Sequence, residues 1–130
     1  MNVNRIKYWL LRLIPAIILL QTLFFKFSAA PESVYIFETL GMEPHGRIGI
    51  GIAELITACL LLYPRTSGIG AILGVGIISG AIFFHITQLG VVVQGDGGLL
   101  FGLAVIVLVF CVIVAWQERR RIPVVQKWFM

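Results

Sequence analysis

Residues 46–90 read GRIGIGIAELITACLLLYPRTSGIGAILGVGIISGAIFFHITQLG. Two apolar runs, 46–63 and 68–90, are separated only by the tight turn Tyr63-Pro64-Arg65-Thr66-Ser67-Gly68. A helix needs about 20 mainly apolar residues to cross a bilayer, within a range of about 17–25, so each run is long enough to span one. Since the turn is so short, the two helices must lie side by side and antiparallel. This stretch therefore predicts a transmembrane helical hairpin.

Two further apolar runs flank the hairpin, at 8–30 and 97–116. Pro15 lies inside the first of them, where neighbouring helices can satisfy the carbonyl that a proline frees. The chain has 130 residues, of which 59% are hydrophobic and only 12% charged, against about 25% charged in an average soluble domain. We therefore predict one all-α domain over residues 1–130, an integral membrane four-helix bundle.

The basic residues are distributed unevenly over the two ends of this predicted bundle. One end receives Arg5, Lys7, Arg12, Arg65, Arg119, Arg120, Arg121 and Lys127. The other end receives Glu32, Glu38, Glu43 and Asp96, with Arg47. Because Lys and Arg accumulate on the cytoplasmic side, we predict an inner (cytoplasmic) membrane protein with both termini in the cytoplasm. The net charge of +4 thus reflects orientation in the lipid bilayer and not nucleic-acid binding.

Local signals add detail to this topology. The aromatic residues Trp9, Tyr63, Trp116 and Trp128 fall at the predicted cytoplasmic boundary, as an aromatic belt does. Residues 31–41 read as a short helix, because Pro31 suits a first helical position and Gly41 suits a C-terminal cap. The apolar residues of this segment predict that it lies in the outer membrane interface.

Small residues predict where helices approach closely. They are Gly70, Gly74, Gly76, Gly80 and Ala81 in the third run, and Gly98 and Gly102 in the fourth. A homodimer through these faces is one interpretation. Cys59 and Cys111 form no CxxC pair, and we interpret them as small buried residues.

Three ionisable residues lie inside the apolar runs, in the outer half of the predicted membrane: Lys26, Glu54 and His85. Such residues are costly in a bilayer and usually face the bundle interior or a watery cavity. We therefore predict that the three side chains meet in one outward-opening pocket, with Glu54 bonded to at least one basic group. The candidate ligand-binding residues are Lys26, Glu54, His85, Gln88, Arg47 and Gln21, and no metal site is predicted.

Each of these residues also has a structural interpretation. Lys26 can extend to the outer headgroups, and Glu54 can serve in a purely structural ion pair. His85 can be a hydrogen-bonded core histidine. Arg47 can anchor the interface or pair with Glu38 or Glu43. Sequence alone leaves these alternatives open.

Several short motifs follow one another along the chain in a characteristic order. They include Lys26-Phe27, Gly51-Ile52-Ala53-Glu54 and Ala81-Ile82-Phe83-Phe84-His85. In this order and spacing the chain resembles the DoxX family of small membrane proteins, over nearly its whole length. The resemblance implies a four-helix membrane bundle. It also implies a link to redox systems, since the family name comes from subunits associated with a thiosulfate:quinone oxidoreductase.

Two functional hypotheses follow from the polar residues and this resemblance. The first is a membrane subunit of a redox or respiratory system, which binds quinone or another small amphipathic molecule in the outer pocket. The alternative is a non-catalytic assembly factor or partner-binding protein, in which the ion pair only holds the bundle together. A proton-coupled transporter would require a dimer, because four helices leave little room for alternating access.

Overall fold

The structure, a computed structural model, describes residues 3–43, 45–90 and 97–119. Its four long helices are α1 (Val3–Phe27), α3 (His45–Leu62), α4 (Ser67–Phe84) and α5 (Leu99–Gln117). The π-helix η1 (His85–Leu89) continues α4, and a short helix α2 (Pro31–Thr39) lies between α1 and α3. Each of the four long helices, with η1 counted as part of α4, is long and apolar enough to cross a membrane. The predicted all-α class is thus confirmed, and so are four helices that are long and apolar enough to span a membrane.

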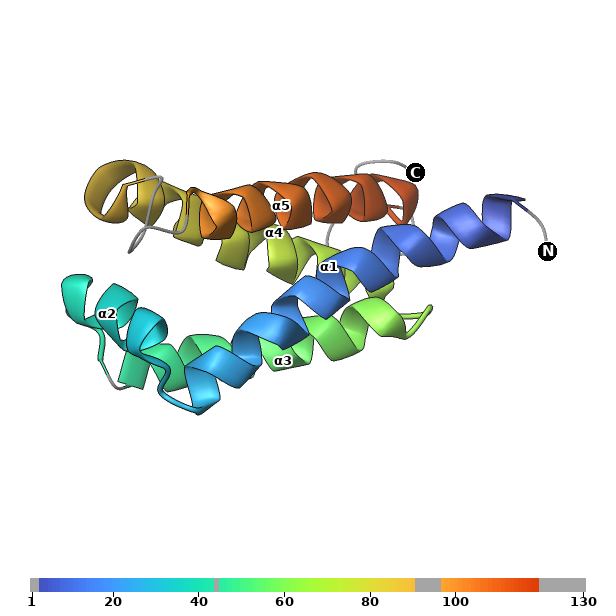
Figure 1. Cartoon of the computed structure of the whole chain (residues 1–130). Helices are drawn as coiled ribbons and strands as arrows, with labels where there is room; N and C mark the ends of the chain where they lie inside the picture. The colour runs from blue at the N-terminus through green and yellow to red at the C-terminus, as the bar shows by residue number, and fades with distance from the viewer. Residues whose placement is uncertain (1–2, 44, 91–96, 120–130) are drawn as a thin grey trace.

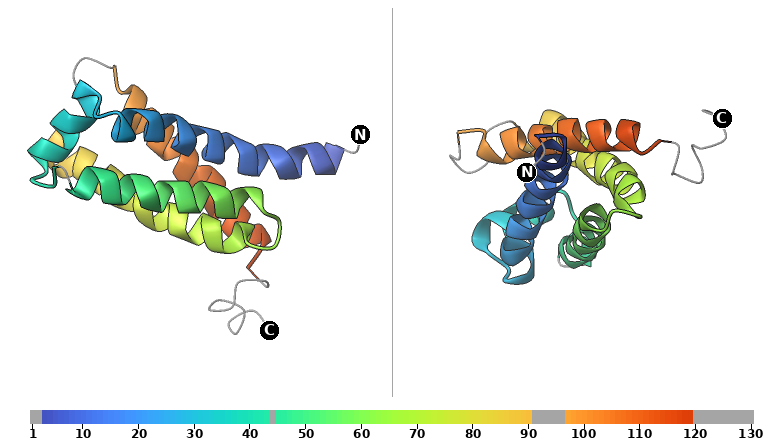
Figure 2. Two further views of the ribbon diagram at one scale, coloured as in Figure 1. Left: turned by 90° about the horizontal axis from the view of Figure 1, so that it is seen from below. Right: turned by 90° about the vertical axis from the view of Figure 1, so that its right-hand side faces the viewer.

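The four long helices run alternately up and down (Figure 1). Helix α1 packs against α3 and α5, and α4 packs against the same two helices, so the order around the bundle is α1, α3, α4, α5. The start of α1, the α3–α4 turn and the end of α5 share one end of the bundle, called here the turn end (Figures 1 and 2). Helix α2, η1 and the start of α5 share the other, called here the α2 end.

The helix boundaries differ most from the prediction in α1, which was expected over 8–30. The helix begins at Val3 because Arg5 and Lys7 are good helix formers that extend it beyond the apolar run. It ends at Phe27, since Ala29 has a positive φ of 55° and Ala30 precedes a proline, which disfavours helical backbone. The other three spans agree with the prediction to within two residues.

Helix α2 has the two ends that its sequence predicts. Pro31 occupies the first helical position. Gly41 follows the last turn with a φ of 73°, which a residue without Cβ adopts readily. Its N–H donates to the Glu38 carbonyl at 3.0 Å, and the Met42 N–H donates to the Phe37 carbonyl at 2.7 Å. These two bonds form a Schellman motif and confirm the predicted cap. The position of α2 relative to a membrane stays a prediction.

Glycines on one face of α4 allow close helix packing. A Cβ at Gly70 would lie 2.8 Å from the backbone nitrogen of Leu61 on α3, and one at Gly74 would lie 2.7 Å from Cys111 Sγ on α5. By contrast, a Cβ at Gly76, Gly80 or Gly102 would meet nothing within 4 Å. The predicted close packing is therefore confirmed for Gly70 and Gly74. It is wrong within this chain for the other three, which point away from the bundle.

We expect Gly70→Ala to lower the free energy of unfolding by about 1–3 kcal/mol, because the added methyl group meets backbone that cannot move aside easily. The matched control is Gly49→Ala on α3, where a Cβ meets nothing within 4 Å. That change should be neutral or slightly stabilising, since alanine favours the helix by up to about 1 kcal/mol. Equilibrium unfolding in mixed micelles measures both, and equal effects would contradict the packing described here.

The two cysteines occupy different environments. Cys111 is buried in the core, where its sulfur fills the space that Gly74 leaves. Cys59 is exposed on α3, so the prediction that it is buried was wrong. The reason is helical geometry, because the neighbouring Ala58 faces the core and the next residue is rotated by about 100°.

Some predictions fall on parts of the chain outside the described residues. These are the glycine-rich turn up to Asp96 and the basic segment from residue 120, with Arg120, Arg121, Lys127 and Trp128.

Candidate functional site

The contact between α1 and α3 at the α2 end contains a buried ion pair. Lys26 Nζ lies 3.0 Å from Glu54 Oε1, and the two side chains are only 14% and 6% exposed. The Thr22 hydroxyl, one turn before Lys26, donates to Glu54 Oε2 at 2.8 Å. Both carboxylate oxygens of Glu54 are therefore engaged, one by a cation and one by a hydroxyl. The prediction that Glu54 binds a basic group is confirmed.

Local sequence explains why the two helices meet here. On α1, Lys26 continues the interior face that also carries Leu19 and Leu23. On α3, Gly51 and Glu54 are one turn apart on the buried face. A Cβ at Gly51 would lie 2.7 Å from the Phe27 ring, so this glycine allows α1 to approach. The approach brings the Glu54 carboxylate within reach of Lys26.

Arg47 extends this contact toward the start of α3. Its Nε donates to both oxygens of Glu43, at 2.8 and 3.0 Å, which confirms the predicted pairing with that residue. Its Nη1 donates to the backbone carbonyl of Lys26. Carbonyls in the last turn of a helix lack partners within the helix and attract cations, so Arg47 caps α1. We call Thr22, Lys26, Glu43, Arg47 and Glu54 the seam cluster.

His85 does not join the seam cluster. Its Nδ1 lies 3.0 Å from the carbonyl oxygen of Gly90, and its ring contacts Phe101 of α5 edge-on with the centroids 5.7 Å apart. Since a carbonyl can only accept, Nδ1 carries a proton, and in the neutral ring Nε2 is then an acceptor. The prediction that the three ionisable side chains meet is thus confirmed for Lys26 and Glu54, whereas the outward-opening pocket stays a prediction. For His85 the predicted contact is wrong, because its side chain bonds to neither of them.

The position of His85 follows from the end of α4. This helix lies between α3 and α5, and His85 opens the π-helical turn, which is wider than an α-helical turn. The ring contacts Phe101 of α5. Gln88, predicted beside it, is exposed, and Gln21 is exposed on α1, so neither amide lies in the interior.

The charged groups of the seam cluster pair with one another and hold α1 against α3. The two cations of the cluster are neutralised by its two carboxylates, and hydrogen bonds hold the remaining oxygens. One hollow on the described surface is lined by residues of α1 and Leu55 of α3, and another by residues of α1 alone. Neither is lined by Lys26, Glu54 or His85. Within the described ranges, no three His, Cys, Asp or Glu side chains gather as metal ligands would.

A second buried ion pair lies at the turn end, and the sequence interpretation missed it. Arg12 is fully buried, and its Nη2 lies 2.9 Å from Glu118 Oε1. Its Nη1 donates to the Tyr8 carbonyl at 2.9 Å, and its guanidinium lies 3.5 Å from the centre of the Tyr8 ring. The sequence interpretation counted Arg12 only among the basic residues of this end and did not predict that it is buried. Its depth of one turn inside the apolar run was the available signal.

The two ion pairs fasten α1 at both ends. Arg12 and Lys26 are 14 positions apart on the interior face, about 21 Å along the helix axis. Arg12 holds α1 to the residue that follows α5, and Lys26 holds it to α3. Between the two pairs the interior of the bundle is mainly apolar, with Leu19, Leu61 and Val107 among its buried side chains.

Comparison with known proteins adds one relative of undetermined role. Over 72 residues the chain is 33% identical to the uncharacterized protein YwoB of Bacillus subtilis (strain 168). The matched part is 55% of this chain and 42% of that protein, so the match spans less than half of the relative's length. No family model and no solved structure matches the chain.

Proposed function

We propose that this chain is a non-catalytic integral membrane protein that works by binding other transmembrane helices, in the first place a second copy of itself. The observation that carries the proposal is the outward face of α4, where a Cβ at Gly76 or Gly80 would meet nothing within 4 Å. On this face the two glycines leave a gap among the exposed apolar side chains Ile72, Leu73 and Phe83.

The spacing of the two glycines suits helix association. They lie four residues apart, so they are neighbours on one face, and small residues at this spacing let two backbones approach closely in a membrane. Ser79 is exposed beside them and offers a hydroxyl for a hydrogen bond between helices. A second helix packed on this face would make van der Waals contacts with the backbone that an isolated chain does not make.

The state of the buried charges supports a non-catalytic role. Lys26 pairs with Glu54, and Arg47 pairs with Glu43 and donates to the Lys26 carbonyl. The side chains of Lys26, Glu54 and Arg47 are largely buried. Arg12 is buried in the same way. These groups are bonded within the bundle, which supports a structural role for them.

The test is cross-linking through a cysteine at Ser79→Cys, in a chain that also carries Cys59→Ala to remove the exposed thiol. We expect oxidation in membranes to give a disulfide-linked dimer through that cysteine. Gly76→Ile combined with Gly80→Ile should reduce the dimer at least fivefold, because the branched side chains separate the backbones. Gly49→Ile, at an equally open position on α3, should leave the yield unchanged. No dimer, or equal yields in all variants, would overturn the proposal.

We also propose that the protein lies in the inner (cytoplasmic) membrane with the turn end in the cytoplasm. The described basic residues outside the seam cluster lie at the turn end, namely Arg5, Lys7, Arg12, Arg65 and Arg119. Accumulation of Lys and Arg on the cytoplasmic side supports this orientation. A cysteine at Arg65 should react with impermeant maleimide only from the cytoplasm, and one at Gly41 only from outside.

A second candidate function is favoured by His85. Its Nε2 is an acceptor in a π-helical turn, and such turns are frequent at functional sites. In a quinone-binding subunit like those implied by the DoxX resemblance, this nitrogen would accept a hydrogen bond from a quinol hydroxyl. Membership of that family is itself a proposal, supported by the order and spacing of the motifs. A short-chain quinol that binds the purified protein equally well with and without His85→Phe would contradict this candidate.

A further inference from the structure

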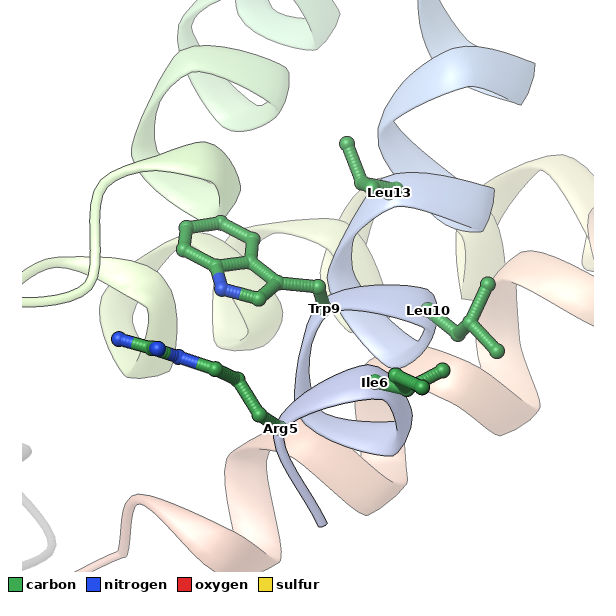
Figure 3. Close-up of a pocket in the computed structure, with 5 residues that line it drawn as sticks. All are labelled: Arg5, Ile6, Trp9, Leu10 and Leu13. Carbon is green, nitrogen blue, oxygen red and sulfur yellow. The ribbon is translucent and has the colours of Figure 1, made fainter. Parts of the chain in front are cut away.

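A shallow hollow of about 400 Å³ lies on α1 near its start, at the turn end. It is lined by Arg5, Ile6, Trp9, Leu10 and Leu13. Figure 3 shows Arg5 and Trp9 reaching to one side of α1, with Ile6 and Leu10 on the other. The hollow is independent of the seam cluster and of the α4 face.

The lining residues form two ridges along the helix. Arg5, Trp9 and Leu13 are spaced four apart, and Ile6, Leu10 and Leu13 are spaced four and three apart, so each set follows one side of the helix. The ridges meet at Leu13, about 12 Å from Arg5 along the axis. The groove between them is thus polar and charged near the start of α1, at Arg5 and Trp9, and apolar toward Leu13.

The end of the groove near the start of α1 offers hydrogen-bond donors. Arg5 is exposed, and the Trp9 indole nitrogen lies on the edge of the ring nearer to Arg5 (Figure 3). The Trp9 ring is held by an edge contact with Tyr8, with the ring centroids 5.4 Å apart. Glu118, the described carboxylate at this end, is 8% exposed and bonded to Arg12. The exposed charge around the groove is therefore positive.

We propose that this hollow binds an anionic phospholipid. The phosphate group sits against the Arg5 guanidinium and the Trp9 N–H, and one acyl chain follows the groove to Leu13. Charge complementarity favours an anionic headgroup, and the graded polarity over about 12 Å matches the passage from headgroup to acyl chain. A helix of another protein would not need a charge at only one end of the groove.

The test is native mass spectrometry of the full chain in neutral detergent, with phosphatidylglycerol or phosphatidylcholine of identical acyl chains added. We expect phosphatidylglycerol to bind more tightly. Arg5→Gln should weaken its binding about fivefold, since a basic residue near a lipid surface contributes about 1 kcal/mol. Lys7→Gln is the matched control, because Lys7 is exposed on the same turn and does not line the hollow. Its effect should be less than half as large.

The apolar part of the groove is tested separately. Leu13→Ser should weaken the binding of both lipids, and inorganic phosphate at millimolar concentration should not displace phosphatidylglycerol. Equal effects of Arg5→Gln and Lys7→Gln would overturn the proposal in favour of diffuse charge attraction. Displacement by inorganic phosphate would overturn it in favour of a simple anion site.

Discussion

We expect Glu54→Leu to lower the free energy of unfolding by about 3–5 kcal/mol, because it leaves the ammonium group of Lys26 buried without its carboxylate. The pair is 3.0 Å apart and the lysine side chain is only 14% exposed, so water compensates little of this loss. Unfolding of the purified protein in mixed micelles measures the effect.

The matched control for this change is Glu38→Gln. Glu38 is an exposed carboxylate on α2 at the same end of the bundle, so its neutralisation should change the free energy of unfolding by less than about 0.5 kcal/mol. If Glu54→Leu were as mild as Glu38→Gln, the ion pair would contribute nothing to the α1–α3 contact.

Arg12→Leu should be comparably destabilising, by about 3–5 kcal/mol. The change removes a fully buried guanidinium from the Glu118 carboxylate, from the Tyr8 carbonyl and from the face of the Tyr8 ring. Arg12→Lys should recover only part of the loss, because an ammonium group cannot make the same forked contacts.

Unfolding in mixed micelles again measures the outcome, with Lys7→Leu as the control at an exposed position on the same helix. That change should have little effect. An Arg12→Leu variant as stable as Lys7→Leu would show that the turn end is not held by this pair.

The parts of the fold that sequence predicts are those determined locally. The length of each apolar run gives the helices, and the short turn at residues 63–68 gives the hairpin. Pro31 and Gly41 give the ends of α2, because cap residues act through their own backbone. The Lys26–Glu54 pair was also predictable, since a lysine and a glutamate at equal depth in neighbouring apolar helices lower each other's cost.

The parts that sequence misses depend on which helices are neighbours. A basic residue one turn inside an apolar run can reach the headgroups or turn inward. Arg12 turns inward because α5 ends beside it and places Glu118 within reach. His85 lies at the α2 end of the bundle, as Lys26 and Glu54 do, but the end of α4 brings its ring against Phe101 of α5. Similarly, Gly70 and Gly76 look alike in sequence, and only the packing separates the one that contacts α3 from the one that faces outward.

The structural role of the seam cluster is tested most directly by the double variant Lys26→Met with Glu54→Leu. Replacing a buried ion pair by apolar residues of similar volume is often neutral or stabilising. Thr22 keeps a partner in the double variant, because its hydroxyl also lies 2.8 Å from the Leu19 carbonyl. We therefore predict that the double variant regains most of the stability lost in Glu54→Leu and cross-links through Ser79→Cys as well as the parent. A double variant that is stably folded but has lost cross-linking, or has lost binding of a quinol that the parent binds, would contradict this account.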